Sequence, residues 1–202
     1  MANRTARPAT VGVVTRVERL TPRMVRVVVG GGVGGKSLAG LDIGGYTDHY
    51  VKVLFPRPEV SYPEPFDLGA IRDTMPREQW PVTRTYTVRR WLPGVPEMWI
   101  DFVVHGDTGP HAGIAGPWAA RARPGEPFRF LGPGGGYAPD PAADWHLLAG
   151  DESALPAIAA ALEGMPAGAR VLAFIEVADD GEVQKLETPG DAEITWLPRD
   201  GR

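Results

Sequence analysis

The chain has 202 residues, of which 43% are hydrophobic and 23% charged, so it is long enough to bury a core and has an ordinary globular composition. Its net charge of −4 argues against a general nucleic-acid or anionic-membrane surface, and no apolar run approaches the length needed to span a bilayer. The sequence contains no cysteine, which excludes disulfides, thiolate metal sites, cysteine-ligated iron–sulfur clusters and cysteine nucleophiles.

The four histidines are far apart in the sequence and match no metal-ligand spacing. They are His49, His105, His111 and His146. We therefore expect no metal bound by the protein, and redox chemistry would need an organic cofactor. The first twelve residues carry positive charge without a following apolar core, so we expect no secretory signal and a cytoplasmic location.

The N-terminal two thirds of the chain is strand-like and punctuated by Gly and Pro. Residues 11–20 and 24–29 are rich in β-branched residues and predict two strands joined by a hairpin at 21–23. A glycine-rich segment, 30–35, follows. The end of this segment, together with Lys36-Ser37, partly matches a phosphate-binding P-loop. Because no helical periodicity follows Ser37, we interpret the segment as a flexible loop.

Further strands are predicted at 49–55, 83–91, 98–105 and 127–131, with a short helix at 117–123. The segment 56–81 carries six prolines and is predicted to be a long excursion over the surface. Several short antiparallel strands with turn signals between them indicate a sandwich or a small barrel.

The pattern changes at Trp145. The continuous apolar run at 171–177 is typical of a parallel strand buried on both faces, and further strands are predicted at the short apolar run 145–149 and at 193–198. Between the runs at 145–149 and 171–177, apolar residues recur at helical spacing from Leu155 to Leu162. This β-α-β order predicts the opening of a doubly wound sheet.

The start of that helix has its own signals. Ser153 is the predicted N-cap, and Pro156 falls in the first turn, where its missing N–H costs little. We place the boundary between the barrel-like part and the α/β part near residues 139–144.

The strand at 83–91 carries the side chains that best suit a ligand. Because strand side chains alternate, Arg84 and Tyr86 are expected on one face, with Thr85 and Thr87 on the other. A guanidinium suits a diphosphate, an aromatic ring suits a planar heterocycle, and a neighbouring hydroxyl can bond the polar edge of that ring. Diphosphate, ring and polar edge are the parts of a flavin nucleotide.

The motif Arg-x-Tyr-Thr at 84–87 resembles the flavin-binding motif of the ferredoxin-reductase-like flavoproteins. Four further blocks narrow this resemblance: HYVKVLFP at 49–56, DFVVHGDTGP at 101–110, GPWAARARPGE at 116–126 and LAGDESALPAI at 148–158. From about Val11 to Pro198, and in this order, the chain resembles the siderophore-interacting protein family, the FAD-dependent ferric-siderophore reductases.

This resemblance implies a six-stranded antiparallel FAD-binding barrel over residues 1–140 and a partial NAD(P)-binding domain with a doubly wound parallel sheet over 141–202. It implies an enzyme that passes electrons from NADPH or NADH through FAD to a ferric siderophore and releases iron in the cytoplasm. We expect a monomer that binds neither nucleic acid nor a membrane stably. No residue is expected to act as a catalytic acid or base, because the flavin carries the chemistry. Members of the family continue beyond this length, so a truncated form is expected.

The resemblance also assigns roles within the strand motif. It places Arg84 on the FAD pyrophosphate, Tyr86 against the isoalloxazine ring and Thr87 on the polar edge of that ring, with Thr85 in the same motif.

Other cofactor-binding roles follow along the chain. The resemblance places Asp101, Val103 and His105 along the FAD, while a structural role for a histidine near a strand end stays open. Gly116 and Trp118 would start a helix whose N-terminus can complete the pyrophosphate site, although Trp118 also suits the core. The chain repeats Gly-Pro at 109–110 and 116–117, so either copy can face the phosphate.

The resemblance places Asp151, Glu152 and Ser153 on the nicotinamide side of the flavin. Two carboxylates that cap a helix through its dipole would explain the same residues. Lys52 corresponds to a lysine that attracts the anionic ferric siderophore, although a solvated strand lysine is the simpler interpretation. Two other functions stay open: a general flavin reductase of the ferredoxin-reductase type, and a flavin- or siderophore-binding module without enzymatic activity.

Overall fold

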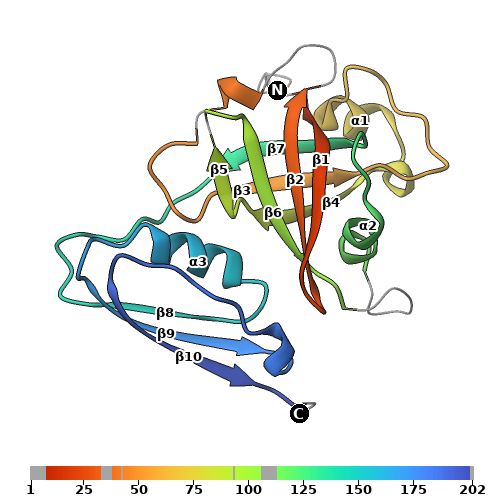
Figure 1. Ribbon diagram of the computed structural model, residues 1–202. Helices are drawn as coiled ribbons and strands as arrows, with labels where there is room; N and C mark the ends of the chain where they lie inside the picture. The colour runs from red at the N-terminus through yellow and green to blue at the C-terminus, as the bar shows by residue number, and fades with distance from the viewer. Residues whose placement is uncertain (1–7, 33–37, 42, 93, 106–112, 201–202) are drawn as a thin grey trace.

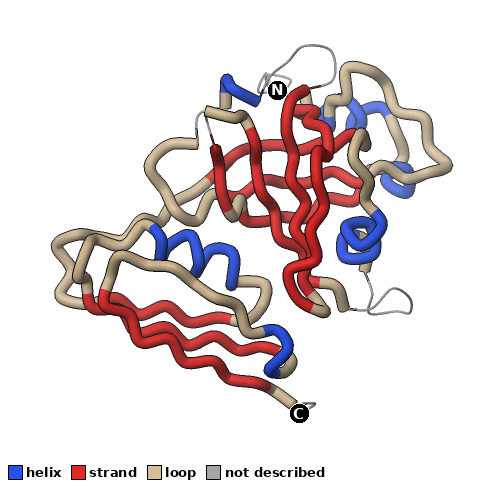
Figure 2. Tube along the Cα trace, in the orientation of Figure 1, coloured by secondary structure: helices blue, strands red, loops and turns tan. Residues whose placement is uncertain are grey.

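A computed structural model describes residues 8–32, 38–41, 43–92, 94–105 and 113–200, which form two sheets (Figures 1 and 2). The first sheet has the order β4-β3-β7-β1-β2-β6-β5, and all its pairs are antiparallel. Its strands are β1 (Thr10–Thr21), β2 (Met24–Gly32), β3 (Tyr50–Phe55), β4 (Val82–Thr87), β5 (Arg90–Leu92), β6 (Glu97–Val103) and β7 (Pro127–Gly134). The predicted hairpin is present, with Thr21 paired to Met24.

The first sheet closes into a barrel because one strand changes partner. The N–H of Val88 donates to the carbonyl of His49 (2.6 Å), on the β3 side, whereas the N–H of Arg89 donates to the carbonyl of Trp99 (2.8 Å), on the β6 side. β4 and β5 are thus two halves of a sixth strand, and the predicted six-stranded antiparallel barrel is confirmed. The prediction of one continuous strand over 83–91 is wrong at this point.

The barrel closes incompletely. Among the described strands, β4 is hydrogen-bonded to β3 alone, and β5 pairs only with Glu97 to Trp99 of β6. The gap between β4 and residues Ile100–Val103 of β6 therefore has no hydrogen-bond ladder, and we call it the seam. The N–H and C=O groups on the free edge of β4 need other partners there.

Aromatic rings fill the barrel at the end covered by α2 (Ala115–Arg121). The Trp118 ring centroid lies 5.6 Å from those of Phe55 and Phe102 and 5.7 Å from that of Phe128, in edge-on or tilted arrangements that aromatic pairs prefer. The helix begins two residues before the predicted start at 117.

The proline-rich segment 56–81 differs from the predicted surface excursion. It contains α1 (Leu68–Thr74). Asp67 is the N-cap of this helix, and its carboxylate accepts the N–H groups of Gly69 and Ala70 at 2.8 and 3.1 Å. Phe66, Leu68 and Ile71 pack with Leu54 into a small core on the outside of the barrel. The segment is therefore a folded layer on the barrel wall.

The second sheet is parallel, in the order β10-β9-β8, and confirms the incomplete doubly wound arrangement. Its elements are β8 (His146–Gly150), α3 (Leu155–Glu163), β9 (Arg170–Val177) and β10 (Asp191–Pro198). The prediction that β9 is buried on both faces is wrong for the described residues. Val171, Ala173 and Ile175 are buried under α3, but Phe174 is 39% exposed on the opposite face.

Two glutamates of the α/β part, Glu163 and Glu182, bind the barrel through hydrogen bonds. The carboxylate of Glu163, in the last turn of α3, accepts two hydrogen bonds from Arg89 (2.6 and 3.1 Å) and one from Arg90 (2.8 Å). The buried carboxylate of Glu182 accepts the N–H of Arg23 (2.9 Å) and the hydroxyl of Thr21, at the tip of the β1–β2 hairpin.

The connection between the two sheets runs through residues 135–145. The predicted domain division at residue 140 falls within it and stays a prediction. Within the described part of the chain, no helix is long and apolar enough to cross a bilayer.

Candidate functional site

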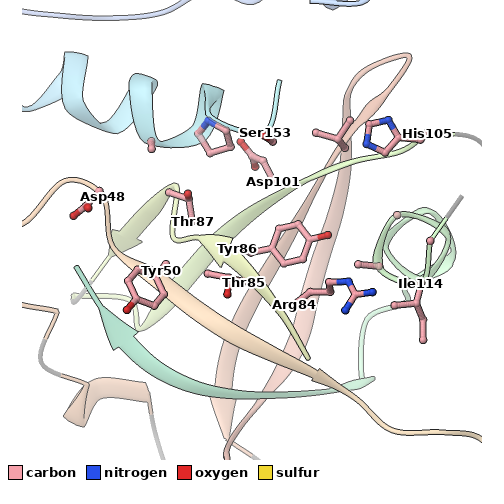
Figure 3. A pocket seen from close by; sticks show the side chains of 16 residues that line it. Asp48, Tyr50, Arg84, Thr85, Tyr86, Thr87, Asp101, His105, Ile114 and Ser153 are labelled. Carbon is pink, nitrogen blue, oxygen red and sulfur yellow. The ribbon is translucent and has the colours of Figure 1, made fainter. Parts of the chain in front are cut away.

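A cavity of 540 Å³ opens at the seam, between the barrel and the start of α3 (Figure 3). Residues from β4, the end of β6, the start of α2 and the start of α3 line it, together with two residues at the start of β3. They are Arg84, Thr85, Tyr86, Thr87, Asp101, Val103, His105, Gly113, Ile114, Ala115, Gly116, Ser153, Pro156, Ala157, Asp48 and Tyr50.

All four residues of the strand motif line this cavity, although they alternate between faces. Arg84 and Tyr86 lie opposite two buried valines of β3, and Thr85 and Thr87 point to the outer side of the barrel wall. The cavity reaches both sets because it runs along the free edge of β4 rather than over one face. A ligand there meets the side chains of both faces and the open backbone edge between them.

Arg84 offers a cation that no carboxylate of the described residues neutralises. Its side chain is exposed, and its guanidinium donates to the carbonyl of Thr83 at 3.0 Å. Figure 3 shows the guanidinium directed toward Ile114 at the start of α2. A planar, multidentate donor in this state suits an anionic diphosphate.

Tyr86 forms a fixed aromatic wall beside Arg84. Its ring is half-buried and packs on Phe102, with the centroids 4.3 Å apart and the planes at 41°. Burial raises the pKa of Tyr86, and the charge of Arg84 opposes that shift, so the phenol stays protonated at neutral pH and can donate a hydrogen bond.

Asp101, Val103 and His105 all reach the cavity, at the end of β6. The Asp101 carboxylate is buried and accepts two hydrogen bonds from Arg26, at 2.7 and 2.8 Å, across the β2–β6 pair. Asp101 therefore also holds these two strands together, and its contact with FAD stays a prediction. His105 is exposed and lies two residues beyond β6, so the predicted strand to 105 is too long.

Gly116 lines the cavity, and its lack of a side chain allows α2 to pack closely on β6. A Cβ at this position would lie 2.9 Å from the carbonyl oxygen of Val103, so only glycine lets α2 pack this closely on the end of β6. Trp118 does not line the cavity but packs against the barrel core, in agreement with the alternative of a core role. The other Gly-Pro, at 109–110, and the P-loop-like Lys36-Ser37 lie outside the described residues.

Of the three residues predicted at the start of α3 to lie near the flavin, Ser153 alone lines the cavity, beside Pro156 and Ala157 of the first turn. The carboxylate of Asp151 accepts the N–H and hydroxyl of Ser153 (2.9 and 2.5 Å) and the N–H of Ala154 (3.2 Å). The hydroxyl bond is the main cause that lowers the pKa of Asp151, against the effect of burial. The N-cap is Ala154, which makes no side-chain capping bond, so the predicted cap at Ser153 is wrong. The Asp151 carboxylate instead fixes the turn that leads into the helix.

Glu152 does not line the cavity and is almost fully buried. It binds Arg199, which also donates to Glu176 at 2.8 Å, at the carboxyl edge of the parallel sheet. The predicted position of Glu152 beside the flavin is therefore not supported, because Glu152 is not among the residues that line the cavity.

Lys52 is exposed on the outer face of β3 and forms no ion pair with a described residue. It does not line the cavity but is paired across the sheet with Thr85, which does. Sequence reasoning missed Tyr50, which shares the outer face with Lys52 and is paired with Thr87. The alternation within HYVKVLFP contained that signal. Reasoning also missed Asp48, whose carboxylate accepts the N–H groups of residues 136 and 137 at 2.8 and 2.9 Å.

The residues of the cavity fit a flavin nucleotide. An unneutralised guanidinium lies at one end, an aromatic wall follows, and the Thr87 hydroxyl lies beyond that wall along the free edge of β4. The volume is in the usual range for small-molecule sites, about 300–1,000 Å³. A ring system along this edge would also meet the unpaired backbone groups of the strand.

Comparison with known proteins agrees with this geometry. A model of the siderophore-interacting FAD-binding domain matches residues 13–137, and a model of siderophore-interacting protein matches residues 143–202. An uncharacterized protein of Mycobacterium tuberculosis is 46% identical over 195 residues, which cover 94% of this chain and 65% of that protein. The ferric vibriobactin reductase ViuB of Vibrio cholerae is 37% identical over 195 residues, covering 91% of this chain and 69% of ViuB.

Among solved structures, a siderophore utilization protein from T. fusca superposes with a TM-score of 0.76 at 41% identity, covering 98% of this chain and 72% of that one. The chain thus spans 65% of the length of the mycobacterial relative.

Proposed function

Because the chain belongs to the siderophore-interacting protein family, we propose that it is an FAD-containing ferric-siderophore reductase. In this proposal NADPH or NADH supplies electrons, which pass through FAD to the Fe(III) of a siderophore. The observation that carries the proposal is the row of Arg84, Tyr86 and Thr87 along the free edge of β4.

Each residue of this row has a distinct task. Arg84 binds the diphosphate and fixes the cofactor along the edge of the strand. Tyr86 packs on the ring system and excludes water from one of its faces, and the Thr87 hydroxyl bonds its polar edge. When bound, FAD supplies the conversion of a two-electron donor into single electrons, so no side chain has to act as an acid or base.

The two reactants would approach from different sides. Ser153, at the carboxyl end of β8 and the start of α3, lies where open α/β sheets bind nucleotides, and we assign the nicotinamide to that side. The ferric siderophore would approach the outer face of β3, where Lys52 supplies positive charge. Reduction releases the iron, because hard oxygen ligands hold Fe(II) less tightly than Fe(III). We place this reaction in the cytoplasm, with the protein acting as a monomer.

Anaerobic spectroscopy of the purified protein tests this function. NADPH or NADH should bleach the visible bands of the bound flavin, and a ferric siderophore should restore them while a ferrous-specific chelator develops colour. A flavin that neither nucleotide bleaches would favour a binding module without enzymatic activity. Faster reoxidation by quinones or ferredoxin than by ferric chelates would favour a general flavin reductase.

A further inference from the structure

The carboxylate of Glu163 holds two arginines at the point where the barrel strand changes partner. Arg89 donates to it through both terminal nitrogens of its guanidinium, at 2.6 and 3.1 Å, and Arg90 adds a third bond of 2.8 Å. The Arg89 side chain is only 12% exposed and that of Glu163 is 26% exposed, so solvent screens this pair less than an ordinary surface ion pair. We call these three residues the clamp.

The clamp lies at the closed end of the seam. The N–H of Val88 bonds to the β3 side and that of Arg89 to the β6 side, so the gap between β4 and β6 starts at these two residues. Thr87, the last residue of β4, lines the cavity and directly precedes them. A displacement of the Arg89 side chain would therefore move the backbone that carries Thr87 and change the width of the seam.

A second series of contacts leads from the clamp to the opposite side of the seam. The Arg90 guanidinium lies 5.1 Å from the centroid of the Trp99 ring, and that of Arg26 lies 4.7 Å from a ring centroid of the same side chain. Arg26 in turn donates two hydrogen bonds to Asp101, which lines the cavity from β6. The indole nitrogen of Trp99 is buried without a hydrogen-bond partner among the described residues, so packing and the two guanidinium groups hold this ring.

The clamp belongs to a helix that also reaches the cavity directly. α3 lines the cavity at its start, through Pro156 and Ala157, and ends at Glu163. The next residue, Gly164, packs so closely on the barrel that a Cβ there would lie 2.9 Å from a methyl carbon of Thr47, shortly before β3. Figure 1 shows the helix between the barrel and the parallel sheet. One helix thus contacts the cavity at its start and the barrel strands beside the cavity at its end.

We propose that Glu163 is a positioning residue for the flavin ring: through Arg89 it sets where the Thr87 hydroxyl meets the polar edge of that ring. This inference rests on the proposed function, because it concerns the flavin of the same site. The diphosphate lies outside the reach of the clamp, because Arg84 is directed toward the start of α2 at the other end of the cavity. The α/β part would then determine how the barrel holds the cofactor, besides bringing the nicotinamide close.

Titration of the apoprotein with riboflavin, which has the ring but no diphosphate, tests this role. Glu163→Gln keeps the side-chain size and removes the charge that holds the two arginines. It should raise the riboflavin Kd about 3- to 10-fold, the effect of losing one hydrogen bond, and should raise the Kd for FAD by the same factor. The visible absorption bands of the bound flavin should shift toward those of free flavin. Arg90→Gln removes only the more exposed arm of the clamp and should have a smaller effect in the same direction.

Glu182→Gln is the matched control, because Glu182 also joins the α/β part to the barrel but does so at the β1–β2 hairpin. It should leave the riboflavin Kd and the absorption bands unchanged. A double-mutant cycle then tests whether Glu163 acts through Thr87. In a Thr87→Val background, which lacks the hydroxyl, Glu163→Gln should have no further effect on the riboflavin Kd.

An unchanged riboflavin Kd in Glu163→Gln, or an equal loss in Glu182→Gln, would overturn the inference. A loss that adds to that of Thr87→Val would also overturn it, because Glu163 would then act independently of Thr87. Circular dichroism shows which variants are folded at the temperature of the titration, and Arg90→Gln decides the question if Glu163→Gln does not fold. A protein whose ring affinity follows these expectations but that reduces no ferric chelate would refute the proposed function and leave this inference standing.

Discussion

Replacement of Arg84 by glutamine tests the proposed contact with the FAD diphosphate separately from the contacts with the rest of the cofactor. The substitution keeps most of the side-chain length and removes the charge. Arg84 is exposed and has no carboxylate partner among the described residues, so the free energy of unfolding should change by no more than about 0.5 kcal/mol. The effect on binding is expected to be much larger.

A hydrogen bond to a charged group contributes about 1.5–3 kcal/mol. Its loss should raise the Kd for FAD about 12- to 150-fold. Riboflavin has the same ring system but no phosphate, so its affinity should stay the same in Arg84→Gln. Titration of the apoprotein with each flavin, followed by quenching of flavin fluorescence, measures both constants.

A matched control is Arg77→Gln, which removes an exposed arginine that does not line the cavity. It should leave the Kd for both flavins unchanged. If Arg84→Gln weakened FAD and riboflavin by the same factor, the residue would act on the ring or on the fold. If it left FAD affinity within twofold of wild type, the diphosphate assignment would be refuted.

Gly116→Ala should cost about 1–3 kcal/mol in chemical denaturation and lower FAD retention, because its Cβ meets a backbone oxygen at 2.9 Å; a wild-type midpoint would show that α2 shifts freely. Glu163→Gln should destabilise the protein by roughly 1–2 kcal/mol at neutral pH, since it weakens a partly exposed link to two arginines. Burial opposes ionisation of Glu163, but the hydrogen bonds from those arginines outweigh it and lower its pKa below 4.5. Its stabilising contribution is therefore complete above that value and is lost as the pH falls through the lower folded-state pKa, a dependence that the glutamine variant should lack. Lys52→Glu should slow reoxidation of the reduced flavin by an anionic ferric chelate far more than reduction by NADPH or NADH, and added salt should shrink the difference; equal losses in both steps would point to the fold instead.

Local sequence patterns predicted the strands of the barrel and the β-α-β order, because hydrophobic alternation and helical spacing are properties of short segments. The change of partner at Val88 and Arg89 was not predictable in this way. Both halves of the strand carry similar residues, and only closure of the barrel decides that one half pairs with β3 and the other with β6. α1 was not predicted, because its seven helical residues are too few to show a clear helical period and lie between proline-rich stretches.

The site shows the same division between local and long-range information. That Arg84, Tyr86 and Thr87 line one cavity could be predicted from their residue types on one strand, while their contacts with a flavin stay a prediction. Their arrangement along a free strand edge was not, because an edge is defined by the absence of a neighbour. At the start of α3, Ser153 is a good capping residue by type, but the helix begins one residue too late for it, with Ala154 as the N-cap.

In the proposed site, FAD would lie in the seam and would become part of the barrel wall. In the apoprotein, amide hydrogens on the free edge of β4 would bond only to water and exchange quickly with deuterium. A flavin bound along that edge would protect them and would supply hydrogen-bond partners that β6 does not provide. Because the ligand binds only the folded chain, FAD at about 1,000 times its Kd adds roughly 4 kcal/mol to the free energy of unfolding. Melting temperatures of site variants therefore report cofactor occupancy as much as packing, unless all are measured at saturating FAD.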